Sequence, residues 1–177
     1  ENIAGILARP RLKVVRGDIR DRGLVGGIFS RHSFSAVIHL AARAGVRPSL
    51  RDPLLYQDVN VGGTLLLLEE ARRRGVKKFI FASSSSVYGD CPRQPLRETE
   101  KTLVPVSPYG LTKLIGEKLV RIFHQQYGLK VCALRFFTVY GPRQRPDMAI
   151  HKFSRLLTEE KNIPVFGDGS SQRDYTF

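Results

Sequence analysis

A tyrosine and a lysine stand four residues apart, at Tyr109 and Lys113, and follow a run of four serines from Ser83 to Ser86. On a helix, residues at positions i and i+4 share one face, so the lysine ammonium would point into the site that holds the tyrosine hydroxyl. A neighbouring cation favours the phenolate form of a tyrosine. Such a tyrosine can take a proton from a hydroxyl group while hydride leaves the carbon beneath it. The spacing alone is common on solvated helices, and the serine run upstream makes it specific.

Alternating apolar strands and amphipathic helices are predicted to position these residues. The run Ala36 to Leu40 is nearly continuous in apolar residues, which is typical of a strand buried on both faces of a parallel sheet. The helix that carries the tyrosine is expected over Tyr109 to Tyr127 and to end at Gly128. The alternation predicts an α/β fold with a doubly wound parallel sheet. Strands are expected at 12–15, 36–40, 78–82, 131–136 and 164–166, and helices at 22–29, 59–74, 109–127 and 148–160.

Composition and charge exclude several classes of protein. The 177 residues are 42% hydrophobic and 25% charged, as in an ordinary globular protein, and no apolar run approaches the length of a membrane span. The start Glu1-Asn2-Ile3 is no signal peptide, and Cys91 and Cys132 are too few for a disulfide scaffold. We therefore expect a cytoplasmic location, free thiols and no membrane partner.

The net charge of +13 invites a nucleic-acid interpretation, which we do not favour. The arginines are spread along the chain, and no run reaches five basic residues. The triplet Arg72-Arg73-Arg74 stands where a helix is expected to end, and cations suit that end of a helix. We expect a solvated basic surface, contacts to an anionic substrate and no nucleic-acid partner.

Seven ordered motifs run along the chain. They are Gly17-Asp18-Ile19-Arg20-Asp21, His39-Leu40-Ala41-Ala42, Asn60-Val61-Gly62-Gly63-Thr64, Ser83-Ser84-Ser85-Ser86-Val87-Tyr88-Gly89, Tyr109-x-x-x-Lys113, Leu134-Arg135-Phe136-Phe137-Thr138-Val139-Tyr140-Gly141-Pro142 and Arg173-Asp174-Tyr175. Together they resemble the extended short-chain dehydrogenase/reductase family, and within it the NAD-dependent nucleotide-sugar epimerases and dehydratases. The similarity covers essentially the whole chain and is greatest to UDP-glucose and UDP-glucuronate 4-epimerases. It implies a Rossmann-like sheet, NAD as cofactor, a UDP-sugar substrate and a homodimer formed through a helical bundle that includes 109–127.

The departures from the family pattern lie at the two ends. The first two strands and the glycine-rich loop that cradles the pyrophosphate are absent, so the chain resembles an internal fragment. Residues 1–142 would be a partial NAD-binding domain that carries the catalytic residues, and residues 143–177 the beginning of a substrate-binding region. The missing strands form the centre of the sheet, which leaves 36–40 with an unpaired apolar edge. We expect these residues alone to be inactive, to bind NAD poorly and to aggregate.

The resemblance assigns catalysis to Ser84, Tyr109 and Lys113. Ser84 lies four residues before Tyr88, where the family places its catalytic serine or threonine, and its hydroxyl would orient the reacting sugar oxygen. The alternative is a serine loop that satisfies only backbone groups.

A second set of residues resembles the family's NAD-binding positions. Asp18 would accept a hydrogen bond from the adenine amino group, or it would cap a helix. Asn60 would brace the active-site strands, or it too would be a helix cap. The set is Asp18, Ile19, Leu40, Ala41, Ala42, Asn60, Ser83, Tyr109, Lys113 and Phe136.

A third set resembles substrate-binding positions. Arg173 would pair with the sugar-nucleotide diphosphate, Phe166 would lie against the uracil ring, and Arg47 would meet a C6 carboxylate. The alternatives are core packing for Phe137 and Phe166 and a surface position for Arg47. The four histidines show no metal-ligand spacing, so we expect no metal site. The set is Arg47, Ser84, Ser85, Phe137, Thr138, Phe166 and Arg173.

The residues after Ser84 favour one reaction of the family. Relatives that dehydrate nucleotide sugars carry Asp-Glu at the two positions where this chain has Ser85 and Ser86. Without a carboxylate to shuttle protons, elimination is disfavoured and 4-epimerisation is expected. In the mechanism that the resemblance implies, Tyr109 removes the O4 proton, directly or through Ser84. Hydride then passes from C4 to NAD, the 4-keto sugar rotates, and hydride returns to the other face.

Two alternatives stay open beside epimerisation. One is another reaction of the same scaffold, such as a reductase or a dehydratase. The other is a non-catalytic NAD-binding regulator, a class in which the tyrosine or lysine is often lost. Whether the sugar carries a carboxylate or a hydroxymethyl group at C6 is also open.

Overall fold

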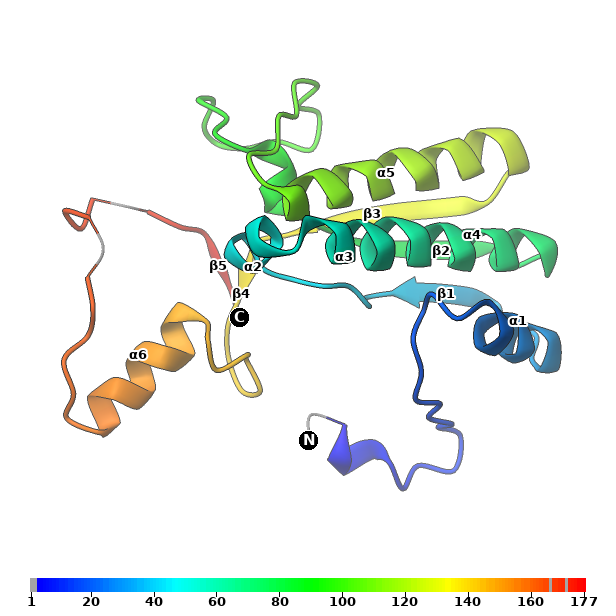
Figure 1. Cartoon of the computed structure of the whole chain (residues 1–177), viewed down its shortest axis with the longest axis horizontal. Helices are drawn as coiled ribbons and strands as arrows, with labels where there is room; N and C mark the ends of the chain where they lie inside the picture. Colours follow the sequence, from blue (N-terminus) through cyan, green and yellow to red (C-terminus); the bar gives the residue numbers. More distant parts are fainter. Residues whose placement is uncertain (1–2, 166, 171) are drawn as a thin grey trace. The chain divides into compact units, whose positions relative to one another are not determined.

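The computed structural model describes residues 3–165, 167–170 and 172–177 (Figure 1). The chain divides into two compact units. The larger is Arg16–Phe136, and the smaller combines Glu1–Val15 with Phe137–Phe177. The boundary expected at residue 142 separates cofactor-binding from substrate-binding functions and stays a prediction.

A parallel sheet of three strands forms the centre of the larger unit. The strands are β1 (Ala36–His39), β2 (Lys78–Ser84) and β3 (Lys130–Phe136), in the order β1-β2-β3. Ser84 is the register partner of Phe136, so the two strands end together. The expected α/β fold with a parallel sheet is confirmed. A doubly wound sheet carries helices on both faces. The long helices of this unit lie on one face, so the double winding stays a prediction.

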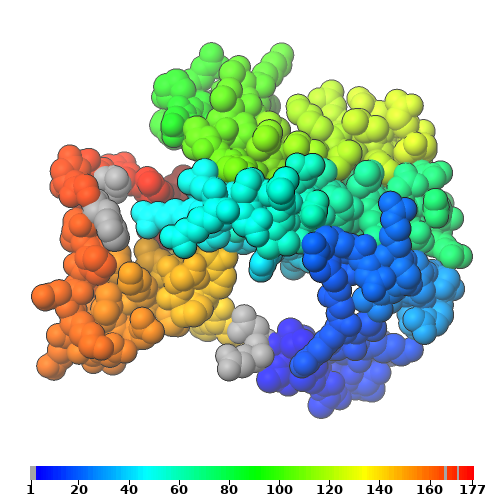
Figure 2. Space-filling view, in the orientation of Figure 1, coloured from blue at the N-terminus to red at the C-terminus, as the bar shows by residue number. Residues whose placement is uncertain are grey.

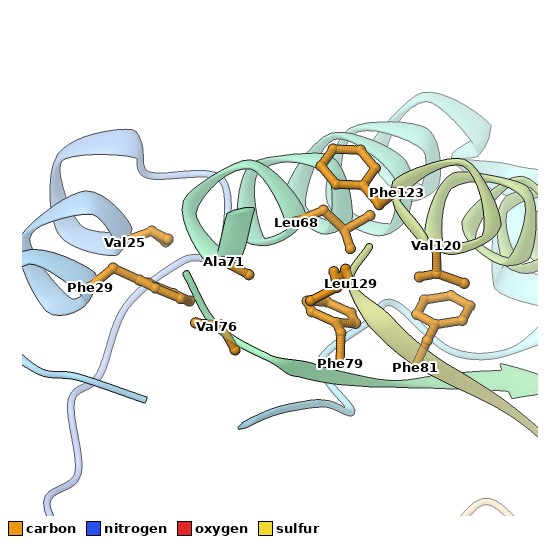
Figure 3. Packing of buried hydrophobic residues seen from close by; sticks show 10 residues of the cluster. All are labelled: Val25, Phe29, Leu68, Ala71, Val76, Phe79, Phe81, Val120, Phe123 and Leu129. Atoms are coloured by element: carbon orange, nitrogen blue, oxygen red, sulfur yellow. The ribbon is translucent and has the colours of Figure 1, made fainter. Parts of the chain in front are cut away.

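The three long helices of this unit cover that face. They are α1 (Arg22–Arg31), α4 (Gly63–Arg73) and α5 (Pro108–Tyr127), each within a few residues of its expected bounds. Figure 3 shows their apolar side chains above Phe79 and Phe81 of β2. The core consists of Val25, Phe29, Leu68, Ala71, Val76, Phe79, Phe81, Val120, Phe123 and Leu129.

Local sequence explains where α5 begins and ends. The Ser107 hydroxyl accepts a hydrogen bond from Gly110 N at 3.1 Å, and Pro108 occupies the first helical turn. Gly128 ends the helix in the left-handed conformation, with φ of +69°. These signals set the two ends of the helix that carries Tyr109 and Lys113.

A glycine lets α5 approach β2 closely. A Cβ atom at Gly116 would lie 2.2 Å from Cζ of Phe81, well inside contact distance. Phe81 is 1% exposed, so its ring has little room to move. Gly116 thus sets the separation between the helix and the strand.

Four short helical segments were not expected from the sequence as separate elements. They are α2 (Val46–Arg51), α3 (Pro53–Gln57), the π-helix η2 (Asp58–Gly62) and the 3₁₀-helix η3 (Ser85–Tyr88). Asp52 caps α3, with its carboxylate accepting from Leu55 N at 3.2 Å. Each is too short for a periodic apolar pattern to reveal it.

The sheet face opposite the helices is apolar and exposed. Ile38 is 64% exposed, Phe136 43% and Leu134 39%, and they alternate along their strands with residues that face the helices. β1 is an edge strand of this sheet. The expected unpaired apolar edge at 36–40 is therefore present.

The smaller unit contains η1 (Ala4–Ile6), α6 (Ala149–Thr158) and a parallel pair, β4 (Thr138–Val139) with β5 (Tyr175–Thr176). Two expected strands are wrong here. Residues 12–15 form no strand, because no neighbouring strand offers them hydrogen bonds. Pro164 and Val165 form none either, and Phe166 lies outside the described residues. No helix in the described ranges is long and apolar enough to cross a membrane.

The exposed sheet face is expected to make the 177-residue chain self-associate and bind NAD weakly. Ile38→Lys should lower the self-associated fraction severalfold in size-exclusion chromatography with light scattering, because it places a charge on that face. Leu54→Lys is the matched control, since Leu54 is 73% exposed but lies on α3. A monodisperse wild-type chain, or an equal response to both substitutions, would contradict this expectation.

Candidate active site

Lys113 of α5 is buried between this helix and the end of β2. Its Nζ donates a hydrogen bond to the Ala82 carbonyl oxygen at 2.7 Å, and the residue is only 4% exposed. Nζ also lies 6.0 Å from the ring centroid of Tyr109 and 5.2 Å from that of Phe81. Burial lowers the pKa of Lys113 to about 8, because water no longer solvates the ammonium. The structure therefore brings the predicted tyrosine–lysine pair together.

Ser84 ends β2 and begins the turn into η3. Its hydroxyl accepts from Ser86 N at 3.1 Å and donates to the Ser86 hydroxyl at 3.2 Å. These local bonds are those expected of a serine that satisfies neighbouring backbone groups. They fix the side chain at the strand end, and the catalytic role of Ser84 stays a prediction.

A second glycine brings η3 and the start of α5 into backbone contact. A Cβ atom at Gly110 would lie 2.6 Å from the Ser86 carbonyl oxygen, so only glycine fits without displacement. Gly110 directly follows Tyr109. The tyrosine backbone is thereby held beside the serine turn.

The segments α2 and α3 lie beside the first turn of α5, as the space-filling view shows (cyan against green, Figure 2). The Tyr56 ring packs edge-on against the Tyr109 ring, with centroids 6.3 Å apart and an interplanar angle of 84°. The Tyr56 hydroxyl donates to the Ala44 carbonyl oxygen at 2.8 Å. Tyr109, which is partly buried, is therefore packed from a side that the sequence did not predict.

Asn60 links three segments around the tyrosine. Its side-chain oxygen accepts from Arg43 N at 2.7 Å, and its nitrogen donates to Arg43 O and to the Thr112 hydroxyl, both at 3.0 Å. The Thr112 hydroxyl in turn donates to the Tyr109 carbonyl oxygen at 2.8 Å. Asn60 thus acts as a brace and caps no helix, while its contact with NAD stays a prediction.

The π-helix η2 positions this brace. Gly63 N donates to the Asp58 carbonyl oxygen five residues back, which is the π-helical pattern. The Thr64 hydroxyl donates to the Asn60 carbonyl oxygen at 2.5 Å, so it must accept the hydrogen bond from His39 Nε2 at 2.8 Å. His39, to which the sequence assigned no role, therefore carries its proton on Nε2. Burial, together with the charge of Lys113, lowers the pKa of His39 to about 4 and keeps it neutral.

Asp18 is exposed and paired with Arg20, whose Nη2 donates to it at 2.6 Å. The hydrogen bonds from Arg20 lower the pKa of Asp18 to about 2. Asp18 does not cap α1, because Asp21 does so by accepting from Leu24 N. Ile19 packs against Gly63, where a Cβ atom would lie 2.5 Å from Ile19 Cδ1.

The other predicted cofactor residues lie near the strand ends. Leu40, 64% exposed, and Ala41 and Ala42 follow β1, and Phe136 ends β3. The Ser83 hydroxyl donates to Glu117 Oε1 at 2.5 Å. Contact of each with NAD stays a prediction.

The predicted substrate residues are divided between the two units. Ser84, Ser85 and the exposed Arg47 of α2 belong to the larger unit. Phe137, Thr138 and Arg173 belong to the smaller unit, where Arg173 Nη1 donates to the Gln172 carbonyl oxygen at 2.6 Å. Their roles stay predictions, and Phe166 lies outside the described residues.

Sequence reasoning missed three polar residues that hold the site. They are Thr112, Glu117 and Arg135. Thr112 of α5 bonds to Asn60, and Glu117 of α5 bonds to Ser83 and Arg135. Glu117 stands one turn beyond Lys113 on the same helical face, and Arg135 is a charged residue between Leu134 and Phe136 of an apolar strand. Both signals were present in the sequence.

Asn60→Ala is expected to lower the free energy of unfolding by about 2 kcal/mol, because it removes the hydrogen bonds to the Arg43 backbone and to the buried Thr112 hydroxyl. Thr112→Val, which removes one of these partners, should cost about 1 kcal/mol. Urea denaturation followed by circular dichroism measures both. Asp58→Ala is the control, since Asp58 is exposed on the same π-helix. Equal effects of Asn60→Ala and Asp58→Ala would be evidence against the brace.

Lys113 is expected to make stability depend on pH. Its pKa falls from 10.5 in the unfolded chain to about 8 in the folded chain, so the unfolded chain holds one more proton between these values. The cost of burying the ammonium is complete below pH 8 and gone above pH 10.5, so stability rises with pH across this window.

The measurement is the difference in unfolding free energy between wild type and Lys113→Met, by urea denaturation at a series of pH values. The difference should rise by about 3 kcal/mol across the window in favour of wild type. Lys118→Met, on the exposed face of α5, should give a flat difference. A flat profile for Lys113→Met as well would show that the ammonium is not buried.

The chain is similar to known proteins over nearly its whole length. Residues 2–177 match the model of the NAD dependent epimerase/dehydratase family. A UDP-glucuronate 4-epimerase of Thermodesulfobacterium geofontis is 50% identical over 161 residues, which are 90% of this chain and 49% of the relative.

Two solved structures are similar in fold and sequence. The UDP-glucuronic acid 4-epimerase of Bacillus cereus, in complex with UDP-glucuronic acid and NAD, is 39% identical with a TM-score of 0.90, over 99% of this chain and 55% of the other. The UDP-glucose 4-epimerase of Thermotoga maritima, with UDP-glucose, is 39% identical with a TM-score of 0.87, over 91% and 53%. The chain spans about half the length of the relatives it matches. Because the family model matches almost the entire length of the chain, the chain belongs to the NAD-dependent epimerase/dehydratase family.

Proposed function

We propose that the whole protein interconverts the C4 epimers of a UDP-hexose, with UDP-glucuronate as the first candidate and UDP-glucose as the second. The observation that carries this proposal is the buried Lys113, held by the Ala82 carbonyl oxygen at 2.7 Å and 6.0 Å from the Tyr109 ring. A cation fixed beside a phenol favours the phenolate, which is the form that removes a proton from an alcohol.

Each residue of the site has a proposed task at the sugar. Tyr109 takes the proton from O4 and later returns it, and Lys113 keeps the phenolate charge compensated. Ser84, fixed at the strand end by Ser86, orients O4 by hydrogen bonding. The Asn60 and Thr112 bonds hold the tyrosine backbone while the proton moves.

The residues present fit NAD in their chemistry. The ends of β1 and β2 meet at one edge of a parallel sheet, which is where dinucleotides bind in open α/β folds. Asp18 offers an exposed carboxylate for the adenine amino group, and the small Ala41 allows the backbone to approach a ligand. When bound, NAD supplies the acceptor and donor of hydride at C4.

The two positions after Ser84 carry no carboxylate, which favours epimerisation over elimination. Ser85 and Ser86 follow Ser84, and neither can act as the acid or base that elimination needs. The carboxylate of Glu117 is already engaged by Ser83 and by two donors of Arg135. No proton shuttle beyond Tyr109 is therefore proposed.

The similarity to UDP-glucuronate 4-epimerases favours a substrate with a C6 carboxylate. Arg47, exposed on α2, is the proposed partner of that carboxylate. Ser85, Phe137, Thr138 and Phe166 complete the proposed substrate contacts, and Arg173 binds the diphosphate.

A homodimer is proposed through α5. This helix exposes Leu111 at 49% and Ile122 at 48%, on the side away from its buried residues. Burial of such residues against a second copy is the arrangement expected of a helical bundle.

The test uses the whole protein with NAD and, separately, UDP-glucuronate and UDP-glucose, with products separated by anion-exchange chromatography. A C4 epimer should form from one of them, and Tyr109→Phe should lower kcat by about 10²–10⁴-fold because the base is lost. Tyr127→Phe makes the same change at an exposed position of α5 and should have no effect.

Arg47→Gln should raise KM about tenfold for UDP-glucuronate and leave UDP-glucose unaffected, because only the former carries a carboxylate. A stable 4-keto-6-deoxy product or net consumption of NADPH would instead show another reaction of the scaffold. No product from either sugar, with NAD still bound, would favour a regulatory protein.

A further inference from the structure

A partly buried ion pair joins four elements at the serine end of β2. Glu117 of α5 accepts two hydrogen bonds from Arg135 of β3, from Nε and Nη2, both at 2.9 Å. Ser83 of β2 donates to the same carboxylate at 2.5 Å, and the Arg135 guanidinium lies 4.8 Å above the Tyr88 ring of η3. We call Ser83, Tyr88, Glu117 and Arg135 the Glu117 clamp.

The clamp is largely shielded from water. The side chain of Glu117 is 11% exposed and that of Arg135 is 15% exposed. The hydrogen bond to Glu117 raises the pKa of Arg135 further above its usual value, so the guanidinium stays charged. A bidentate pair of this kind fixes distance and orientation together.

Stability alone is a weak reason for such a pair. Removing two charges from water costs free energy, and apolar residues of similar size often give equal or greater stability. The hydrophobic core of this unit is apolar, with Phe79 and Phe81 buried on β2 and Val120 buried on α5. What the pair adds over apolar packing is a fixed geometry between the elements it joins.

The clamp lies next to Ser84 in the sequence and on the helix that carries Lys113 and Tyr109. Ser83 directly precedes Ser84 and is the register partner of Arg135, so the clamp fixes the end of β2 against β3. Along α5, Glu117 follows Lys113 by one turn and Tyr109 by two, a rise of about 12 Å on the same face. A shift of the clamp would therefore move Ser84 relative to Tyr109.

We propose that Glu117 and Arg135 are positioning residues that hold Ser84 and Tyr109 at the separation needed for proton transfer. This inference rests on the proposed function. The geometry it requires is distinct from the brace of Asn60, which holds the tyrosine from the other side through Thr112.

The test removes the ion pair while filling its space. In the whole protein, Glu117→Met with Arg135→Met should leave the urea unfolding midpoint close to that of wild type, because the pair is replaced by apolar packing. The value of kcat should fall about tenfold to a hundredfold, with KM changed less than about twofold, because misplacement of reacting groups slows chemistry more than binding. A kcat equal to that of wild type would overturn the proposal.

A conservative variant keeps the test decisive if the double variant does not fold. Arg135→Lys retains the charge but cannot form the two parallel bonds, so kcat should again fall about tenfold. An unchanged kcat in this variant would overturn the proposal as well.

The chain provides a matched control. Arg72 and Glu69 of α4 are also 2.9 Å apart, and Arg72 also lies above a tyrosine ring, at 4.9 Å from Tyr127. This pair is more exposed, at 37% for Arg72 and 31% for Glu69, and it belongs to a different helix from the clamp. Glu69→Met with Arg72→Met should leave kcat and KM unchanged, and a loss equal to that of the clamp variant would refute a specific positioning role.

Amide hydrogen exchange tests the clamp without measuring enzyme activity. In the clamp double variant, amides of 83–88 and 109–113 should exchange at least about tenfold faster, while those of Phe79 and Phe81 keep their protection. Faster exchange in a protein whose wild type does not epimerise would support the clamp and reject the proposed function. Unchanged exchange in a protein whose wild type does epimerise would reject the clamp alone.

Discussion

The arrangement of this molecule depends on how closely one helix can lie on one strand. Gly116 removes the side chain that would collide with Phe81, so α5 approaches β2 until Lys113 reaches the Ala82 carbonyl oxygen. Burying an ammonium is unfavourable, and the hydrogen bond with the nearby aromatic faces offsets only part of that cost. This unfavourable burial is the cause of the lowered pKa of Lys113. A cation is thereby kept beside Tyr109 without access to solvent.

Two hydrogen-bonded networks hold α5 in that position from different sides. On one side, His39, Thr64 and Asn60 lead to Thr112 and so to the Tyr109 backbone. On the other, Glu117 binds β2 and β3 one turn beyond Lys113. Because the side chains of each network are hydrogen-bonded to one another, they specify a geometry that apolar packing alone would leave loose. The apolar core supplies stability, and the polar networks fix the position of α5 relative to its neighbours.

The fold was predictable where periodicity is local and long. The helices at 22–31, 63–73 and 108–127 and the strands at 36–39, 78–84 and 130–136 form close to their expected bounds. The expected strand at 12–15 does not form, because a strand needs a partner and propensity cannot supply one. Likewise, α2 and α3 escaped prediction because their positions follow from packing beside α5.

The sequence by itself determined the chemical groups: the Tyr109–Lys113 spacing, the serines at a strand end, and the caps that begin and end α5. These are properties of residues within a few positions of one another, so the pattern carries them. Only the tertiary structure decided which carbonyl receives Lys113, that Asn60 braces Arg43 and Thr112, and that Glu117 pairs with Arg135. These contacts join residues 17 to 52 positions apart. Their geometry is set by how helices and strands pack, and no local pattern encodes that distance.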